Sequence, residues 1–463
     1  MSNLFKLGFN TVFVNSLDAF TPQYWAMESI AILEENLVMG ALVHRDFEEI
    51  IASSGNIVNT RKPATFTAKR KGVNDNVTTQ NATATNVAVP LDQTIHVSFV
   101  IKDAEMSYSF KDLVAEYLYP AMFAEVKMLD QIVLGQMGRF YPNVVGYLGG
   151  MTSSNAHDTV VDASTKLNVL KAPMQQRRMI WTPNTQGLAL KNELFVSAEK
   201  AGDGGLARRQ AELGIVQNFA NYGTQLAGEV TAANSNYVSG AINLAAGYDI
   251  GVTALTVDGF SAAIANGTWV SVNGDLHRVV STTGGATPTV ITIDSPGLRR
   301  AVADNAVVRV CTAAAINEAS GYAAGYSGIL TFDGATKPPI AGQLVAFGTS
   351  TTSAVYTIIE CDSTTMVLDR PLEAALADDA TVHFALPGYY NFAFHRNAIA
   401  LVSRPLATPP AGAGVSSQVI NFNNASVRVT ITYDGLSQGL RITLDMLLGV
   451  QVLDQNLATL VLA

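Results

Sequence analysis

Charged residues and cysteines are scarce in this sequence. Of its 463 residues, 14% are charged and 48% are hydrophobic, and the mean hydropathy is +0.21. Cys311 and Cys361 allow at most one disulfide and no metal site made of cysteines alone. We expect both to be reduced thiols, the usual state in a cytosolic product. So low a charge content indicates that much of the surface is buried between chains, and the length suits two or three domains.

Long apolar runs and a secretory leader are also absent. No run reaches the roughly 18 apolar residues from which a membrane helix is recognised. One lysine precedes Gly8, and no cleavage site of small residues follows an apolar core, so the N-terminus does not fit a secretory signal. These features predict a protein that does not associate with membranes.

The motifs of common enzymes and cofactor sites are missing as well. The histidines are not paired at the spacing of metal ligands, and neither cysteine has the sequence context of a nucleophile. The glycine-rich segment 200–205 lacks the lysine and the Ser/Thr of a phosphate cradle. We expect His157-Asp158, the nearest approach to a catalytic couple, to be structural or on the surface. The sequence therefore predicts no enzyme, no cofactor and no metal. The six histidines are His44, His96, His157, His277, His383 and His395.

The net charge of −9, with a pI near 5.2, argues against a general nucleic-acid binder. The charge is unevenly distributed, however. Residues 57–75 hold five cationic side chains against one acid, Asp75. This cationic segment is either the solvated face of a flexible arm or a contact strip for an acidic partner surface. Its five cations are Arg61, Lys62, Lys69, Arg70 and Lys71.

An acidic region precedes the cationic segment. The arm of one subunit could lie across the acids of another, and the sequence is equally compatible with pairing inside one chain or with no pairing. Exposed ion pairs contribute little singly. The candidate acidic partners are Glu34, Glu35, Asp46, Glu48 and Glu49.

Residues 57–106 are predicted to form an extended arm. Its two limbs, 57–71 and 94–101, alternate apolar and polar residues, which is typical of strands with two unlike faces. Turn residues gather at 72–76, so we expect the limbs to form a β-hairpin. A two-stranded ribbon is only marginally stable alone in water, and another surface is therefore expected to cover it.

A long helix is predicted directly after the arm, over 107–140. Ser109 and Asp112 form a capping-box pattern at its start, and Pro120 is expected to kink it. About thirty helical residues span on the order of 45 Å, which suits a subunit that reaches its neighbours. Apolar residues at three- and four-residue intervals mark one face: Leu113, Tyr117, Met122, Val126, Leu129, Ile132, Val133 and Met137.

Residues 238–388 contain many short strand patterns separated by Gly, Asp and Asn turns. An internal repeat with a spacing of 75 residues predicts two tandem small β-barrels or sandwiches, at about 250–311 and 325–386. We expect the recurring aspartates to form Asx turns. The matching segments are Leu255–Gly259 with Leu330–Gly334, and Ile293–Pro296 with Leu368–Pro371.

The segments on either side of this β region carry mixed signals. Residues 162–223 show both helix and strand patterns, and Asp434-Gly435 marks a hairpin between alternating strands. Residues 447–462 are strongly apolar and are expected in a core or an interface. The fold class expected for the whole chain is α+β, with a large inserted all-β region.

In this order, the segments resemble the major capsid (coat) proteins of tailed bacteriophages. Within them, the chain looks most like the short-tailed-phage coat family, whose subunits carry an inserted β domain. The resemblance covers most of the chain outside 240–388. It rests on Trp25–Asp46, Asn59–Pro63, Phe66–Lys71, Val97–Asp103 and Asn391–Leu406.

The resemblance implies the HK-ninety-seven capsid fold, although the family's insert is usually a single barrel. The implied function is self-assembly, through contacts of each arm with a neighbour, into an icosahedral shell that encloses double-stranded DNA and matures from a procapsid. The implied partners are further copies in hexamers and pentamers, scaffolding and portal proteins, and DNA enclosed without sequence-specific binding. The implied location is the virion capsid, after assembly in the cytoplasm of the bacterial host.

The resemblance also implies a domain layout. It comprises an N-terminal arm with helices at 1–56, the extended loop at 57–106, a spine helix of the peripheral domain at 107–140, an axial domain at 141–237 and 389–410, the insert at 238–388, and peripheral C-terminal strands at 411–463.

Two alternative functions remain open at the level of sequence. An encapsulin-like or other self-assembling shell or lattice protein would enclose a cargo enzyme in place of DNA. A polysaccharide-active enzyme with β accessory modules is less favoured, because it requires a secretory signal and an aromatic-lined acidic cleft.

Overall fold

The structure is a computed structural model that describes residues 38–45, 57–62, 66–73, 76–77, 79–80, 85–103, 117–197, 213–231, 237–409, 415–422 and 425–463. Most of the regular structure in these residues is β, so the expected α+β class is not confirmed. The chain forms two compact units. The described residues of the first lie within 94–126 and 404–447, and those of the second lie within 38–93, 127–403 and 448–463.

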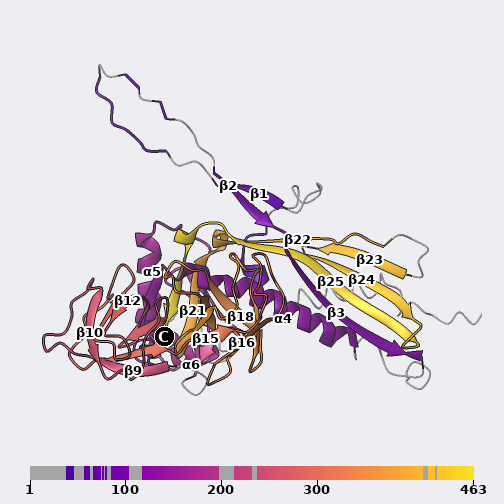
Figure 1. Ribbon diagram of the computed structural model, residues 1–463. Coiled ribbons are helices and arrows are strands. Elements are labelled where there is room, and N and C mark those ends of the chain that lie inside the picture. The colour runs from indigo at the N-terminus through magenta and orange to yellow at the C-terminus, as the bar shows by residue number, and fades with distance from the viewer. Residues whose placement is uncertain are drawn as a thin grey trace, which may run out of the picture. The chain divides into compact units, whose positions relative to one another are not determined.

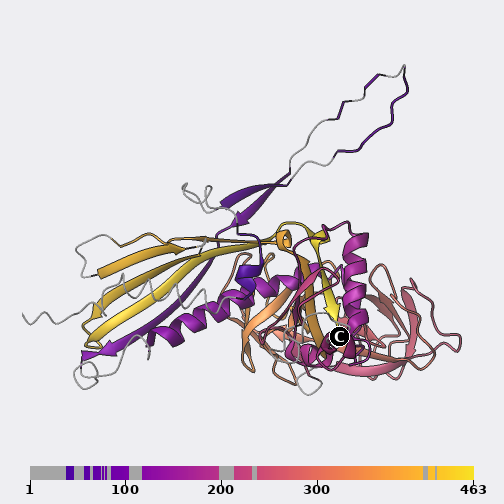
Figure 2. The ribbon, with the colours of Figure 1, turned by 180° about the vertical axis from the view of Figure 1, so that it is seen from behind.

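The first unit contains an antiparallel sheet (Figure 2). β24 pairs with β23 on one side and with β25 on the other, and β3 pairs with β25. The Asp434 carboxylate accepts hydrogen bonds from the Leu436 amide at 3.0 Å and the Ser437 hydroxyl at 2.7 Å, which stabilises the turn expected at this position. The strands are β3 (Gln93–Lys102), β23 (Val415–Phe422), β24 (Ala425–Asp434) and β25 (Gly439–Val452).

The pairing of β3 corrects the expected hairpin of the arm. The sequence predicts that 94–101 returns along the first limb, whereas β1 (Ile57–Lys62) pairs with β2 (Thr85–Pro90). β3 instead lies beside β25 and buries Ile95 and Ile101. Alternation identified a strand at 94–101 but not its partner, because a period of two shows which face is buried and not which strand lies alongside.

Helix α4 (Tyr119–Gly135) runs straight into a 3₁₀ helix, η3 (Gln136–Phe140) (Figure 1). Pro120 is the second residue of α4 and follows the π-helical residues 117–118, and the kink expected there stays a prediction. Ser109 and Leu113 lie outside the described residues. The apolar face is confirmed, since each of these residues is at most 2% exposed: Met122, Val126, Leu129, Ile132, Val133 and Met137.

A mixed sheet forms the centre of the second unit. Its order is β4-β26-β21-β5-β7-β6, with β8 also paired to β21. All residues of β26 are buried, as expected for the apolar C-terminal segment. The strands are β4 (Val144–Gly146), β5 (Arg177–Trp181), β6 (Ile215–Val216), β7 (Phe219–Gly223), β8 (Glu229–Val230), β21 (Gly388–His395) and β26 (Ala458–Leu462).

Short helices and one further strand complete this part of the second unit. Val160 and Leu167 of α5 pack in one core with Trp181, Phe219 and Val461 of the mixed sheet. The remaining elements are α2 (Met39–Leu42), α5 (Ala156–Val169), α6 (Pro183–Ala189), α7 (Glu193–Val196), η5 (Arg396–Ala398), η6 (Gln455–Leu457) and β22 (Ile399–Arg404).

Two closed barrels of six strands each occupy the region of the sequence repeat, which confirms the predicted tandem barrels. Barrel 1 has the order β10-β13-β12-β11-β14-β9, and barrel 2 has the order β15-β16-β19-β18-β17-β20. The strands of barrel 1 are β9 (Tyr237–Ile242), β10 (Ala254–Asp258), β11 (Trp269–Val272), β12 (Asp275–Thr283), β13 (Val290–Ile293) and β14 (Val307–Cys311). Those of barrel 2 are β15 (Ala314–Ile316), β16 (Leu330–Asp333), β17 (Leu344–Phe347), β18 (Val355–Cys361), β19 (Thr365–Leu368) and β20 (Thr381–Phe384).

The two barrels repeat individual contacts as well as strand order. The Tyr248 hydroxyl accepts the Thr256 amide at 2.8 Å in barrel 1, and the Tyr322 hydroxyl accepts the Thr331 amide at 2.8 Å in barrel 2. Each barrel has its own core of buried apolar side chains. The repeat in the sequence therefore corresponds to a repeat in packing.

Candidate assembly arm and the joints of the barrels

The arm begins as the two-stranded antiparallel ribbon of β1 and β2, which runs out from the base of the arm (Figure 1). Its register extends from Ile57 opposite Pro90 to Lys62 opposite Thr85. Thr67 and Gln80 lie five residues beyond the Lys62–Thr85 end of this ladder, one on each side of the arm. The Gln80 side-chain amide donates to the Thr67 carbonyl, and the Gln80 side-chain oxygen accepts the Thr67 amide at 3.0 Å. The two sides of the arm thus keep one register well past the ribbon.

The described part of the arm exposes both apolar and cationic side chains. Phe66, Val73 and Val77 are 65%, 99% and 76% exposed. The side chains of the cationic residues at 69–71 are exposed too, and none of them makes an ion pair with another described residue. Apolar side chains exposed on a thin hairpin are typical of a surface that another molecule covers.

The predicted charge contacts of the arm are only partly described. Lys69, Arg70 and Lys71 lie in the exposed segment beyond the ribbon, and Arg61 and Lys62 lie in β1 itself. The five candidate acidic partners lie outside the described residues: Glu34, Glu35, Asp46, Glu48 and Glu49. The pairing of the arm cations with these acids stays a prediction.

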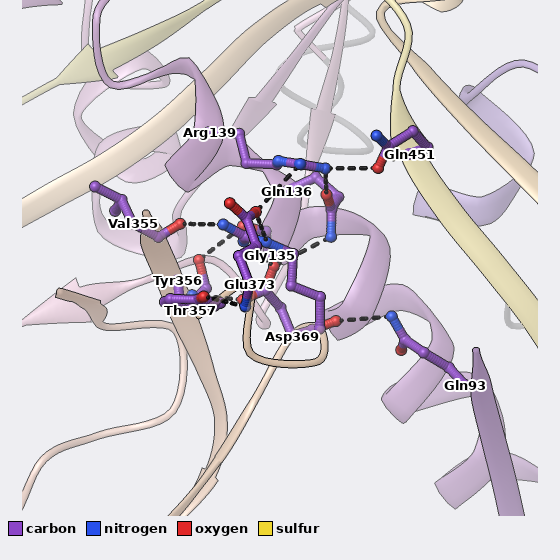
Figure 3. Close-up of polar contacts among 11 residues, drawn as sticks. Gln93, Gly135, Gln136, Arg139, Val355, Tyr356, Thr357, Asp369, Glu373 and Gln451 are labelled. Carbon is purple, nitrogen blue, oxygen red and sulfur yellow. Dashed lines mark hydrogen bonds and ion pairs between the residues drawn. The ribbon is translucent and has the colours of Figure 1, made fainter. Parts of the chain in front are cut away.

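Barrel 2 is joined to the end of α4 by a buried polar cluster (Figure 3). The Thr357 hydroxyl donates to the Gly135 carbonyl at 2.8 Å, and the Gln136 side chain donates to an Asp369 carboxylate oxygen at 3.1 Å. Asp369 also accepts the Thr357 amide at 2.8 Å. At Gly135 an added Cβ would lie 2.4 Å from the Asp369 Cβ, so only glycine allows this close approach.

The charge of Asp369 is balanced inside this joint. Arg370 donates to the Asp369 carboxylate at 2.8 Å, to Glu373 at 3.0 Å and to the Val355 carbonyl at 2.9 Å. Burial by itself would lower the pKa of Arg370, but the carboxylates of Asp369 and Glu373 raise it, so the guanidinium remains charged. Arg139 reaches the same cluster through Glu373 at 3.2 Å. A buried carboxylate held in this way is costly to uncouple from its partner.

Barrel 1 has a joint of its own with the segment that follows η3. The Tyr141 hydroxyl donates to an Asp294 carboxylate oxygen at 3.1 Å, and the Tyr141 ring packs edge-on against Trp269, with 4.8 Å between the ring centroids. Burial and the neighbouring Asp294 carboxylate raise the pKa of Tyr141 well above its ordinary value, so the hydroxyl keeps its proton. Nearby, the Leu148 amide donates to the Gly274 carbonyl at 2.8 Å.

Asp294 and Asp369 occupy equivalent places in the two barrels. Asp294 accepts the Arg278 amide of β12 at 3.2 Å, and Asp369 accepts the Thr357 amide of β18 at 2.8 Å. Each strand has its register irregularity just beyond this residue. The sequence repeat contains both aspartates, but the expectation of Asx turns missed their contacts with 135–141. The recurrence of the two aspartates at a spacing of 75 residues was the feature of the sequence that could have pointed to these contacts.

The barrels are also joined to each other. The Arg278 side chain donates to the Gly267 carbonyl of its own barrel at 2.8 Å and to the Ser353 carbonyl of barrel 2 at 3.2 Å. Thr268 and His383 approach each other at 3.4 Å across the same boundary. Burial, with a contribution from Arg278, lowers the pKa of His383 to about 4, so this histidine is neutral at pH 7.

The first unit contains one buried carboxyl that has no hydrogen-bond partner among the described residues, that of Glu125 in α4. Burial, and then the nearby Asp445 carboxylate, raises the pKa of Glu125 to about 8. Asp445 itself is paired with Arg428 at 2.7 Å. Glu125 is therefore protonated at pH 7.

The remaining described titratable residues are structural in their surroundings. The described residues contain no group of three or more His, Cys, Asp or Glu side chains placed to hold a metal ion. Burial raises the pKa of Cys311 to about 12, which keeps the sulfur protonated and unreactive. The ring of His157 packs against Phe195, with 5.9 Å between the ring centroids. Among the described residues, no helix has both the length and the apolar character that a membrane crossing requires.

No protein-family model matches the sequence, and no curated protein matches it. A solved structure from Mycobacterium phage Che8 is 13% identical, with a TM-score of 0.44, over 92% of this chain and 90% of that chain. The capsid structure of the cyanophage P-SCSP1u is 9% identical, with a TM-score of 0.44, over 92% of this chain and 88% of that chain. The mature capsid of bacteriophage PhiM1 is 10% identical, with a TM-score of 0.39, over 89% and 83%. The likeness is loose and extends along most of the chain.

Proposed function

We propose that this chain is a major capsid protein of a tailed bacteriophage, a structural subunit that self-assembles into the icosahedral shell around double-stranded DNA. The observation that carries the proposal is the arm. Its strands β1 and β2 pair with no other described strand, and beyond them the described residues include three exposed apolar side chains and three adjacent exposed cations. A second copy can cover all of these, because a closed shell repeats one contact around its rotational axes.

The proposed layout is that of the HK-ninety-seven capsid fold. In this layout 57–106 is the extended loop and 107–140 is the spine helix. The axial domain comprises 141–237 and 389–410, and within 411–463 the strands β23, β24 and β25 are peripheral. Ala458–Leu462 is assigned to the axial sheet, because it pairs with β21 and β4. Five arm residues are the proposed contacts to a neighbour, and five acids of that neighbour are their proposed partners, as predicted from the sequence.

We assign the duplicated insert the role of a brace within its own subunit. Both barrels are tied to 135–148 by polar contacts, a buried one at Asp369 and a partly buried one at Asp294. Arg278 ties the barrels to each other. A module that served only as outer decoration would have no need of these polar contacts with 135–148.

The proposed partners are further copies of this chain, scaffolding and portal proteins, and DNA that is enclosed but not bound by sequence. The proposed place of action is the virion capsid, after assembly in the bacterial host cytoplasm. A net charge of −9 suits a wall that holds DNA without adhering to it.

Electron microscopy of the purified protein, expressed with and without its scaffold, tests the proposal. Closed shells that protect double-stranded DNA in the infected cell are the expected result. Shells that enclose an enzyme would favour the encapsulin-like alternative, and monomers under all conditions would overturn shell formation altogether.

A further inference from the structure

His277 is held between two carboxylates inside barrel 1. Its Nε2 lies 2.9 Å from an Asp275 oxygen, and its Nδ1 lies 3.1 Å from an Asp294 oxygen. The His277 side chain is 0% exposed, and those of Asp275 and Asp294 are 1% and 18% exposed. Both ring nitrogens are therefore used, and both face acceptors.

This geometry requires a charged imidazole. Neutral histidine carries one N–H and one lone pair, and only the protonated ring can donate from both nitrogens. An ionised carboxylate has no proton to offer in return. If His277 lost a proton, one of the two contacts would set a nitrogen lone pair against a carboxylate oxygen in a buried site.

Other charged groups face this cluster from several elements. Arg299 donates to Asp275 at 2.6 Å, and the backbone amide of Arg299 donates to the same carboxylate at 2.8 Å. Arg278, the next residue on β12, donates its amide to Asp294. Tyr141 approaches Asp294 from outside the barrel. Asp275 therefore has a permanent cation within hydrogen-bond distance, whereas Asp294 forms its ion pair with His277 and senses the Arg278 guanidinium at longer range.

The same Asp294 carboxylate forms the joint of barrel 1. Its Oδ1 faces His277 and its Oδ2 accepts the Tyr141 hydroxyl. Asp294 and Tyr141 also line an open cleft of about 560 Å³ between the barrels and 138–142, which gives the cluster access to solvent protons. A change in the charge of His277 thus acts directly on the group that holds barrel 1 to 141–148.

We propose that His277 is a proton-operated latch, which fastens barrel 1 to 141–148 while it is protonated and loosens this joint when it is not. The barrel 2 joint has no such control, because Tyr356 occupies the position of His277 and Asp369 is balanced by Arg370, which does not titrate near neutral pH. The latch is a property of the single subunit and holds whether or not the chain forms shells.

The direction of the pH dependence follows from the two groups that titrate. Burial would lower the pKa of His277, but its hydrogen bonds to Asp275 and Asp294 raise it above 6.5. Its contribution is thus complete below 6.5 and disappears as the pH rises through the raised value. Burial would raise the pKa of Asp275, but His277 and Arg299 lower it below 3.8, so this carboxylate weakens the cluster only in strong acid. The contacts of the joint are expected to be complete at pH 5 to 6 and to weaken as the pH rises above 6.5 through the raised pKa of His277.

Two measurements on the full-length protein test the latch. The first is an NMR titration of the histidine side chains, in which His277→Gln identifies the signal of His277. The second is hydrogen exchange at Leu148, whose amide donates across the joint, corrected for intrinsic exchange from pH 5 to 9. Protection of Leu148 should fall with the titration of His277, by about tenfold for each unit by which the closed joint raises the pKa of His277.

The variants separate the latch from a merely structural role. His277→Gln should make the protection of Leu148 independent of pH, and His157→Gln should leave the wild-type pH dependence intact. Tyr141→Phe should keep the titration of His277 but disconnect it from Leu148. An NMR pKa below 6.5 in the wild type would overturn the proposal, and it can be measured even if the variants fail to fold. Equal pH dependence in wild type and His277→Gln would also overturn it.

Discussion

The arm and the barrels are both long segments that extend from the rest of the fold. They differ in how their polar and apolar groups are paired and buried. The barrels close on themselves and bury their ion pair at Asp369 and Arg370 within the subunit. In the arm, β1 and β2 pair with no other described strand, and the apolar side chains of Phe66, Val73 and Val77 beyond them are exposed. Under the proposed function, the barrels stabilise the subunit, whereas the arm contributes through contacts made after folding. Each region should therefore respond differently to mutation.

Asp369→Ala is expected to cause the largest loss of subunit stability. It leaves Arg370 buried without its main partner and removes the contact to Gln136, at a cost of about 3–5 kcal/mol. Urea denaturation measures this cost. Asp333→Ala, at an exposed aspartate of the same barrel, should change the free energy of unfolding by less than ~0.5 kcal/mol. Similar values for both variants would show that the buried joint does not stabilise the subunit.

Glu125 provides the contrasting case of a buried carboxyl without a balancing partner. Its pKa of about 8 in the folded state lies above the ordinary value of 4.5, so ionisation destabilises the fold as the pH rises between these values. The slope should be about 1.4 kcal/mol per pH unit at most. Glu125→Gln should remove this slope, so the variant should be more stable than wild type at pH 8 and similar to it at pH 5. Parallel stability curves from pH 5 to 8 would contradict the buried, protonated carboxyl.

Gly135→Ala tests the close approach of barrel 2 to the end of α4. The new methyl group would meet the Asp369 side chain, and the overpacking should cost about 1–3 kcal/mol. Gly187→Ala is the matched control, because the space around this helical glycine is open; alanine should stabilise α6 there by up to ~1 kcal/mol. Thermal denaturation distinguishes the opposite signs. Stabilisation by both substitutions would mean that the space between Gly135 and Asp369 can hold a methyl group without strain.

The smallest effect on folding is expected from the arm. Reversal of Lys69, Arg70 and Lys71 to glutamate changes only exposed side chains, so the free energy of unfolding should shift by less than ~0.5 kcal/mol. Chemical denaturation of the unassembled subunit measures it. A loss comparable to that of Asp369→Ala would mean that the arm cations stabilise their own subunit, and the contrast between the two regions would fail.

The sequence predicted the local elements well and their partners less well. The tandem barrels followed from a repeat, and the buried face of α4 followed from helical spacing, because both patterns lie within one continuous segment. The predicted pairing of 94–101 with the first limb of the arm was wrong, because alternation carries no information about which strand lies alongside. The joints at Asp294 and Asp369 were missed for the same reason: their contacts with 135–141 connect residues more than a hundred positions apart. His277 looked isolated in the sequence and acquires its two carboxylates only when barrel 1 closes.

Assembly of the arm variant tests the central claim most directly. Wild type and the triple variant Lys69→Glu, Arg70→Glu and Lys71→Glu would be expressed with the scaffold and examined by sedimentation and electron microscopy. The matched control is the reversal of three exposed lysines elsewhere, Lys127, Lys171 and Lys191, which changes the net charge by the same amount. We expect shells from wild type and control, and folded, unassembled subunits from the arm variant. Normal shells from the arm variant would contradict it.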